Sequence, residues 1–164
     1  MTNPTGFLAR PGLAGAMGAL MDEYARAADE LCRVVETLPA ARFERAVESR
    51  DPSTTSLREV CRHVAGAARR YSDYIRKARG LEHVDRFELE PDRLLGPADL
   101  RPRLGEALRY TEGALEGLYD ASEETVAAIR FEVRWGPVYD PEMLLEHAIV
   151  HLLRHRRQIQ RWRG

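Results

Sequence analysis

The chain has 164 residues, 44% hydrophobic and 31% charged, a composition typical of one globular domain with a real core. Its formal net charge of −1 excludes an overall field that attracts nucleic acid or membrane surfaces. No apolar run reaches the roughly 20 residues that span a bilayer, and Cys32 and Cys61 match neither a metal motif nor a disulfide framework. We therefore expect a cytoplasmic protein with a small-molecule substrate, and neither a membrane nor a nucleic-acid partner.

The start of the chain is rich in Gly, Pro and Ala, which predicts a flexible segment over residues 1–15 and a single helical domain over residues 16–164. Apolar side chains then recur at alternating steps of three and four from Leu13 to Leu38. This period predicts one long amphipathic helix that ends at Pro39.

A second helix is predicted after a polar connection. Residues 39–55 mix charge, proline and serine and are typical of a loop. Ser56 is followed three residues later by Glu59, the pattern of a capping box. Apolar residues at helical spacing follow from Leu57 to Ala78, and Gly80 is expected to stop the helix.

The third helix is predicted after a connecting loop over residues 81–97. Pro97 or Ala98 opens it, and leucines at helical spacing continue from Leu100 to Leu118. Its glycines lower its intrinsic helix propensity, so packing must stabilise it. Residues 121–130 are ambiguous and predict at most a helical turn.

The last part of the chain predicts a short extended segment and then a fourth helix. Apolar and charged residues alternate over Phe131–Trp135, and Gly136-Pro137 ends this piece. Asp140 is a suitable N-cap, and Pro141 suits the first helical position. Four amphipathic helices without a convincing sheet predict an all-α fold, a four-helix bundle with long crossover loops.

Three of the five histidines, His147, His151 and His155, lie four residues apart on the predicted last helix. Side chains at this spacing are one turn apart, and two imidazoles so placed can hold one metal ion. Turning about 100° per residue puts His151 and His155 at the edge of the apolar stripe, beside Leu144 and Trp162. His147 falls further round and is a flanking candidate.

A further imidazole, His63, lies at the rim of the apolar face of the second helix. Helical bundles build metal sites from side chains on facing helices. Together with His151 and His155, it would give three nitrogen ligands and leave one coordination position open for water or substrate. Imidazole suits a divalent ion such as zinc, nickel or iron, and the sequence does not choose among them.

Three further residues are secondary candidates around this site. Glu59 is expected to cap its helix or to bond Arg62 or His63; the alternative is a carboxylate that fixes the His63 tautomer. Gln158 is interpreted as a packing or hydrogen-bonding residue rather than a ligand. His147 is interpreted as a rim residue, with a proton shuttle as the alternative because imidazole titrates near neutral pH.

Arg154, Arg157 and Arg161 recur at helical spacing near the end of the last helix. Cations there are favoured by the helix dipole and remain solvated, which is the simpler interpretation. The alternative is that Arg154 and Arg157 bind an anionic substrate or a thiol cofactor.

Three segments together resemble the DinB/YfiT-like family of metal-binding four-helix bundles. They are Ser56–Gly66, Arg134-Trp135-Gly136 and Leu145–Ile159, in which His-x3-His is followed by Arg-x-Gln-Ile. The resemblance implies that His63, His151 and His155 are the metal ligands and that the protein is a homodimer. It also implies a metal-dependent reaction, since relatives include thiol-dependent S-transferases, maleylpyruvate isomerases and hydrolases. Arg154 and Arg157 stand where many members have His and Gly.

Three functional hypotheses follow. The first is a metal-dependent thiol S-transferase or hydrolase, with a metal-bound water or low-molecular-weight thiol as nucleophile. The second is a non-catalytic dimeric helical bundle with a stress-response or structural role. The third is an anion- or DNA-binding protein that uses the terminal arginines.

Overall fold

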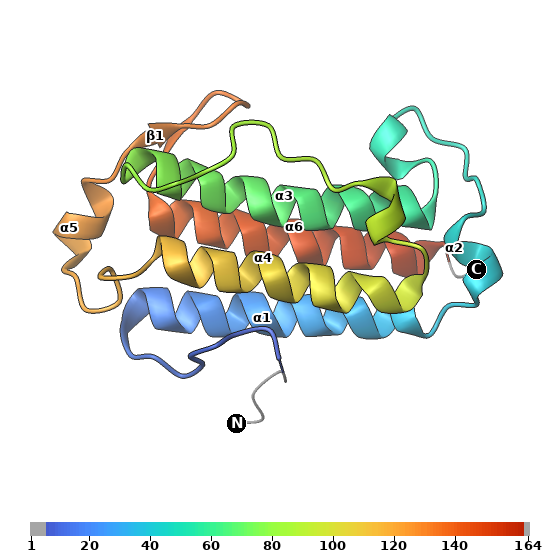
Figure 1. Cartoon of the computed structure of the whole chain (residues 1–164), viewed down its shortest axis with the longest axis horizontal. Coiled ribbons are helices and arrows are strands. Elements are labelled where there is room, and N and C mark those ends of the chain that lie inside the picture. Colours follow the sequence, from blue (N-terminus) through green and yellow to red (C-terminus); the bar gives the residue numbers. More distant parts are fainter. Residues whose placement is uncertain (1–5, 163–164) are drawn as a thin grey trace.

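The computed structural model describes residues 6–162, in which four long helices lie side by side (Figure 1). These are α1 (Gly15–Glu36), α3 (Leu57–Ala78), α4 (Leu100–Ala114) and α6 (Pro141–Arg161). Helix α1 packs against α4 and α6, and α3 packs against the same two helices. The prediction of an all-α fold class is therefore confirmed.

The connections explain the order of these helices. Helices α1 and α6 run in one direction, and α3 and α4 run in the other (Figure 1). Because α3 and α4 are parallel, the chain between them crosses back along the length of the helices. This crossover, residues 79–99, contains the 3-10 turns η2 (Pro91–Arg93) and η3 (Pro97–Asp99). The connection from α1 to α3 contains α2 (Ala40–Phe43) and η1 (Pro52–Thr54).

The N-caps predicted for the second and last helices are confirmed, whereas α4 begins at Leu100 rather than at Pro97 or Ala98. The Asp140 carboxylate accepts from the Met143 amide at 2.9 Å, and Pro141 is the first residue of α6. The Ser56 hydroxyl accepts from the Glu59 amide at 3.1 Å at the start of α3. Each bond satisfies an amide that has no partner within its own helix.

The predicted third helix is too long at its C-terminal end. Helix α4 ends at Ala114, whereas the leucine pattern continues to Leu118. Gly117 has a φ of +78°, a left-handed conformation that a helix does not contain. Leu115 and Leu118 are nevertheless buried, so they pack on the core from a turn rather than from the helix.

The segment between α4 and α6 contains the short helix α5 (Glu123–Ala127) and a small hairpin. Strand β1 (Phe131–Glu132) pairs antiparallel with β2 (Val138–Tyr139). The alternation in the sequence indicates the first strand only. The second follows Gly136, whose amide donates to the Val133 carbonyl at 2.8 Å and closes the turn.

The prediction of a flexible N-terminal segment is wrong for residues 6–14. Phe7 and Leu8 are buried, with 1% and 8% of their surface exposed. The Glu112 carboxylate accepts from the amides of Ala9 and Arg10 at 2.8 and 2.9 Å. Two apolar side chains and a buried carboxylate therefore hold this segment to α4. The rest of the predicted flexible segment, residues 1–5, lies outside the described residues.

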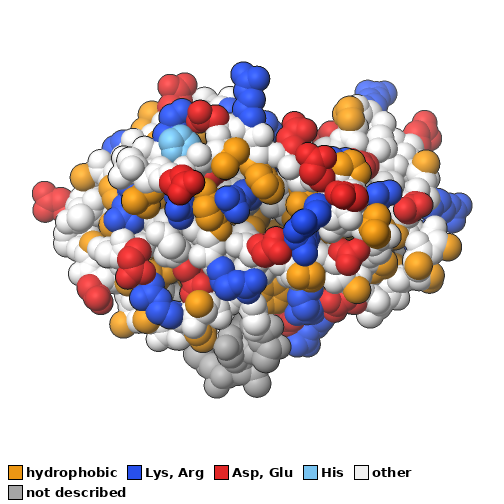
Figure 2. Space-filling view, in the orientation of Figure 1, with side chains coloured by type: hydrophobic (Ala, Val, Ile, Leu, Met, Phe, Trp, Pro, Cys, Tyr) orange, Lys and Arg blue, Asp and Glu red, His pale blue; other side chains and the backbone are white. Residues whose placement is uncertain are grey.

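The core lies between the four long helices. Its largest fully buried side chains are Phe7, Met21, Tyr24, Leu31, Phe43, Ile75, Leu94, Leu100, Leu104, Leu108, Leu115 and Leu144. On the face in Figure 2, basic and acidic side chains are interspersed. No helix within residues 6–162 is long and apolar enough to cross a membrane.

Candidate metal centre

The three histidines expected to bind metal lie together where α3 packs against α6. His63 comes from α3, and His151 and His155 come from successive turns of α6. The His151 Nε2 atom lies 3.0 Å from His63 Nε2 and 3.2 Å from His155 Nε2. His155 is buried and the other two are half-buried. Two helices far apart in the sequence thus direct three ring nitrogens at one point.

Two of the three nitrogen separations fit a single metal ion, and all three nitrogens lie within 4.8 Å of one another. Nitrogens bound at about 2.0–2.1 Å to one tetrahedral zinc ion lie about 3.3 Å apart. The observed separations of 3.0 and 3.2 Å are close to this value. Three imidazoles facing each other without an ion cannot satisfy one another equally, because each neutral ring has one N–H and one lone pair. The donor set therefore suits a cation bound by three nitrogens.

Gln158 orients one of the three rings. The His155 Nδ1 atom lies 2.8 Å from Gln158 Oε1. Since the amide oxygen accepts, Nδ1 carries the proton and the Nε2 lone pair faces the other histidines. This outer hydrogen bond is what a metal-binding imidazole commonly makes. The interpretation of Gln158 as a hydrogen-bonding residue agrees with this contact.

The three imidazoles are neutral at pH 7. Burial lowers the pKa of His63 to about 4, and the neighbouring His155 and Arg70 lower it further. Burial also lowers the pKa of His151 to about 2, with contributions from His155 and His63. The pKa of His155 is lowered by burial as well. Neutral imidazole is the form that binds a metal, so no proton must be removed first.

Two of the secondary candidates lie outside this cluster. The Glu59 carboxylate pairs with Arg62 Nη1 at 2.9 Å. This contact is one of those expected for Glu59 and leaves no bond from Glu59 to His63. The His147 ring stacks on Trp135 with centroids 4.6 Å apart, and its Nδ1 lies 3.5 Å from the Tyr139 hydroxyl. Burial lowers the pKa of His147.

The arginines of the last helix open onto the same space as the histidines. A cavity of about 770 Å³ is lined by the three histidines together with Arg154, Arg157 and Arg161. All three arginines are exposed, as the simpler interpretation of solvated cations expects. The cavity is open and positively charged beside the nitrogen cluster, which is suitable for an anionic ligand.

The sequence did not indicate Asp51, which lines this cavity from the connection between α1 and α3. The hydroxyl and backbone amide of Ser53 donate to its carboxylate at 2.7 and 2.9 Å. The Ser53 hydrogen bonds, and to a smaller extent the nearby His63 and His155, lower the pKa of Asp51. In the sequence, Asp51 resembles any other loop aspartate. Only the fold places it at the same cavity as the residues of α6.

No protein-family model, curated protein or solved structure matches the chain. The DinB/YfiT-like resemblance therefore stays a hypothesis that rests on the residues quoted for it. The geometry of the three histidines is independent of that resemblance.

Proposed function

We propose that this protein is a metal-dependent enzyme in which His63, His151 and His155 bind one divalent ion. The structural type proposed is a four-helix bundle of the DinB/YfiT-like kind, and the reaction is thiol S-transfer or hydrolysis. The observation that carries the proposal is the convergence of three ring nitrogens, at 3.0 and 3.2 Å, from two helices. Three protein ligands leave one position open, which is the arrangement of catalytic rather than structural metal sites.

A bound divalent ion supplies Lewis-acid chemistry at this point, activating a thiol or a water molecule and polarising the substrate. The chain's own residues do the rest. Gln158 fixes the His155 ring so that its Nε2 lone pair faces the site. Arg154 and Arg157 line the open cavity and attract an anionic substrate or thiol. Asp51 lines the same cavity, where the Ser53 hydrogen bonds lower the pKa of its carboxyl and keep it ionised.

Metal stoichiometry tests the proposal, and the chain provides matched controls. Two of its five histidines, His83 and His147, lie outside the cluster. Protein made without a histidine tag is stripped with a chelator, dialysed against zinc or nickel, and analysed for bound metal.

We expect about one ion per chain in the wild type. The His151→Ala, His155→Ala double variant loses two of the three ligands. Metal binding should therefore weaken by more than about 100-fold, which is more than the loss of a hydrogen-bond partner of a ligand causes. A His83→Ala, His147→Ala double variant should retain the ion. Equal loss in both double variants, or no ion in the wild type, contradicts the proposal.

Activity assays then separate the two reaction types. Thiol consumption in the presence of an electrophile, dependent on metal, supports S-transfer. Metal-dependent ester hydrolysis without added thiol supports a hydrolase. Metal binding without either activity favours the second function below.

The alternative is a non-catalytic dimeric protein with a stress-response or structural role. The observation in its favour is the outer face of α6, where Val150 and Met143 have 61% and 43% of their surface exposed. A partner that covers this face removes apolar surface from water. Under this alternative, Val150→Glu should convert a dimer into a monomer in light scattering without changing any bound metal.

A further inference from the structure

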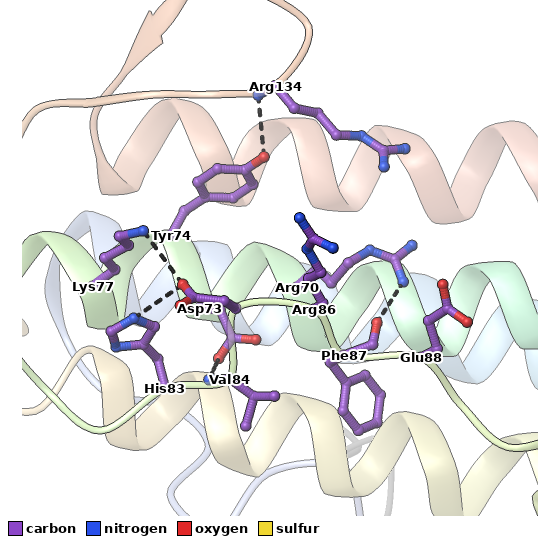
Figure 3. Close-up of a pocket in the computed structure, with 11 residues that line it drawn as sticks. Arg70, Asp73, Tyr74, Lys77, His83, Val84, Arg86, Phe87, Glu88 and Arg134 are labelled. Atoms are coloured by element: carbon purple, nitrogen blue, oxygen red, sulfur yellow. Dashed lines mark hydrogen bonds and ion pairs between the residues drawn. The ribbon is translucent and has the colours of Figure 1, made fainter.

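A second cavity, of about 520 Å³, lies beside the C-terminal half of α3. Its walls are α3, the crossover around residues 83–88, and the hairpin residue Arg134. Figure 3 shows Arg70, Arg86 and Arg134 among the residues around this cavity, with Glu88 near the guanidinium of Arg70. Three elements distant in the sequence therefore contribute a guanidinium group to one space.

The charge in this cavity is only partly balanced. Within residues 6–162, none of Arg70, Arg86 and Arg134 forms an ion pair with an acidic side chain. Burial and the like charge of Arg134 lower the pKa of Arg70, while Glu88 opposes this change. Gathering like charges is unfavourable unless something of opposite sign binds between them.

The other acidic residues that line the cavity are Asp73 and Asp85. The Asp73 carboxylate accepts from the Tyr110 hydroxyl at 2.7 Å and from the Val84 amide. Asp85 pairs with Lys77 and His83, and these two residues lie away from Arg70 and Arg86 in Figure 3. Four basic side chains and three acidic ones line the cavity, which leaves a net positive charge there: Arg70, Lys77, Arg86 and Arg134 against Asp73, Asp85 and Glu88.

Two of the arginines are held in position by the fold. Arg70 lies back over Gly66, where an added Cβ would be 3.0 Å from Arg70 Nη1. The same Nη1 atom donates to the Phe87 carbonyl at 3.0 Å. The Arg134 amide donates to the Tyr74 hydroxyl at 3.1 Å and ties the hairpin to α3. Gly66 thus makes room for a guanidinium group.

A smaller cavity with aromatic walls lies between this cavity and the histidines and shares three of its lining residues. Arg70, Tyr74 and Arg134 also line this smaller space of about 170 Å³, whose other walls include Trp135 and His151. The Tyr74 and Trp135 rings meet edge to face with centroids 6.2 Å apart. A ligand held by the arginines could therefore extend along a flat apolar wall towards the histidine cluster.

We propose that Arg70, Arg86 and Arg134 form a binding site for the carboxylate or phosphate group of a small molecule with an aromatic or flat apolar body. The anionic group lies between the guanidiniums, which bind such oxygens through planar N–H pairs. The body packs against Tyr74 and Trp135 and points to the histidine cluster. This site is separate from the cavity of Arg154 and Arg157, and it goes beyond the proposed function because anion binding here needs no metal.

The test uses metal-free full-length protein and three probes of one shape: benzoate, phenyl phosphate and the neutral benzamide. Binding is followed by calorimetry and by fluorescence in a Trp162→Phe background, where Trp135 is the remaining tryptophan. We expect benzoate or phenyl phosphate to bind at low salt and benzamide to bind at least about tenfold more weakly, since charge-assisted hydrogen bonds provide the difference. The tighter of the two anions identifies which oxygen group the site selects.

Variants locate the binding. Arg70→Gln and Arg134→Gln should each weaken it by about tenfold or more, because each removes a charge-assisted contact. Arg33→Gln removes the same charge from an exposed pair on α1 and should leave it unchanged. An Arg154→Gln, Arg157→Gln double variant should also leave it unchanged, which distinguishes the two cavities.

The result is independent of the metal site. The His151→Ala, His155→Ala variant should still bind the anion, so a failure of metal binding would leave this inference standing. Equal binding of benzamide and the anions, or equal weakening by Arg33→Gln and Arg134→Gln, would overturn it.

Discussion

Glu112 provides a test of how the N-terminal segment is held. Its side chain is 5% exposed and accepts from the amides of Ala9 and Arg10 at 2.8 and 2.9 Å. Glu112→Gln keeps the shape of the side chain but replaces one accepting oxygen by an NH2 group. One of the two backbone amides then faces a donor and loses its partner, while the other bonds a neutral oxygen.

The magnitude follows from these two contacts. A hydrogen bond to a charged group contributes about 1.5–3 kcal/mol and a neutral one about 1 kcal/mol, so we expect a loss of about 2–4 kcal/mol in the free energy of unfolding. For a domain of this size that corresponds to a fall of roughly 4–16 °C in Tm. The effect is large for the replacement of one oxygen by an NH2 group, because both amides lie in a segment with buried Phe7 and Leu8.

Urea denaturation measures the change, and Glu116→Gln is its matched control. Glu116 pairs with Arg10 at the surface, where its side chain is 66% exposed, so its loss should change stability by less than about 1 kcal/mol. Hydrogen exchange should show faster exchange at the Ala9 and Arg10 amides in Glu112→Gln. Equal stability of the two variants, with slow exchange at both amides, would refute the proposed anchor.

Three further predictions concern single side chains. Gln158→Leu should lower metal affinity by about 10–100-fold in a chelator competition, because it removes the bond that orients His155; unchanged affinity would contradict this role. Burial raises the pKa of Cys32 to about 12 and raises that of Cys61, so neither thiol should react with Ellman's reagent at pH 8 until the chain unfolds. Since both folded pKa values exceed the unfolded value of about 8.5, the stability from burying these thiols is present at neutral pH and is lost as pH rises above that value. Gly18→Ala should destabilise the fold by about 2–4 kcal/mol in urea, because its Cβ would lie 1.9 Å from the Leu13 carbonyl oxygen; wild-type stability would contradict this.

Local rules predicted the parts of the structure that depend on neighbouring residues in the sequence. Asp140 and Ser56 begin their helices because a side chain oxygen three residues before a free amide can reach it. The spacing of His151 and His155 predicts that both lie on one face of one helix, because residues four apart are one turn apart. Placing His63 beside them depended on the packing of facing helices, and the structure brings all three together.

The misses depend on contacts between distant residues. Phe7 is buried in a segment that is bound to Glu112, which is more than 100 residues away. Asp51 and Arg86 are ordinary charged residues of connecting segments until the fold places them beside cavities. No periodicity or spacing in the sequence carries that information.

The most direct test of the central claim is the zinc-edge X-ray absorption spectrum of the protein loaded with one equivalent of zinc. We predict three imidazole nitrogens and one light-atom ligand at about 2.0–2.1 Å, with the outer-shell scattering of imidazole rings. That scattering should fall in His63→Ala and remain in His83→Ala. A spectrum without imidazole scattering, or one that His63→Ala leaves unchanged, would contradict a single ion held by α3 and α6 together.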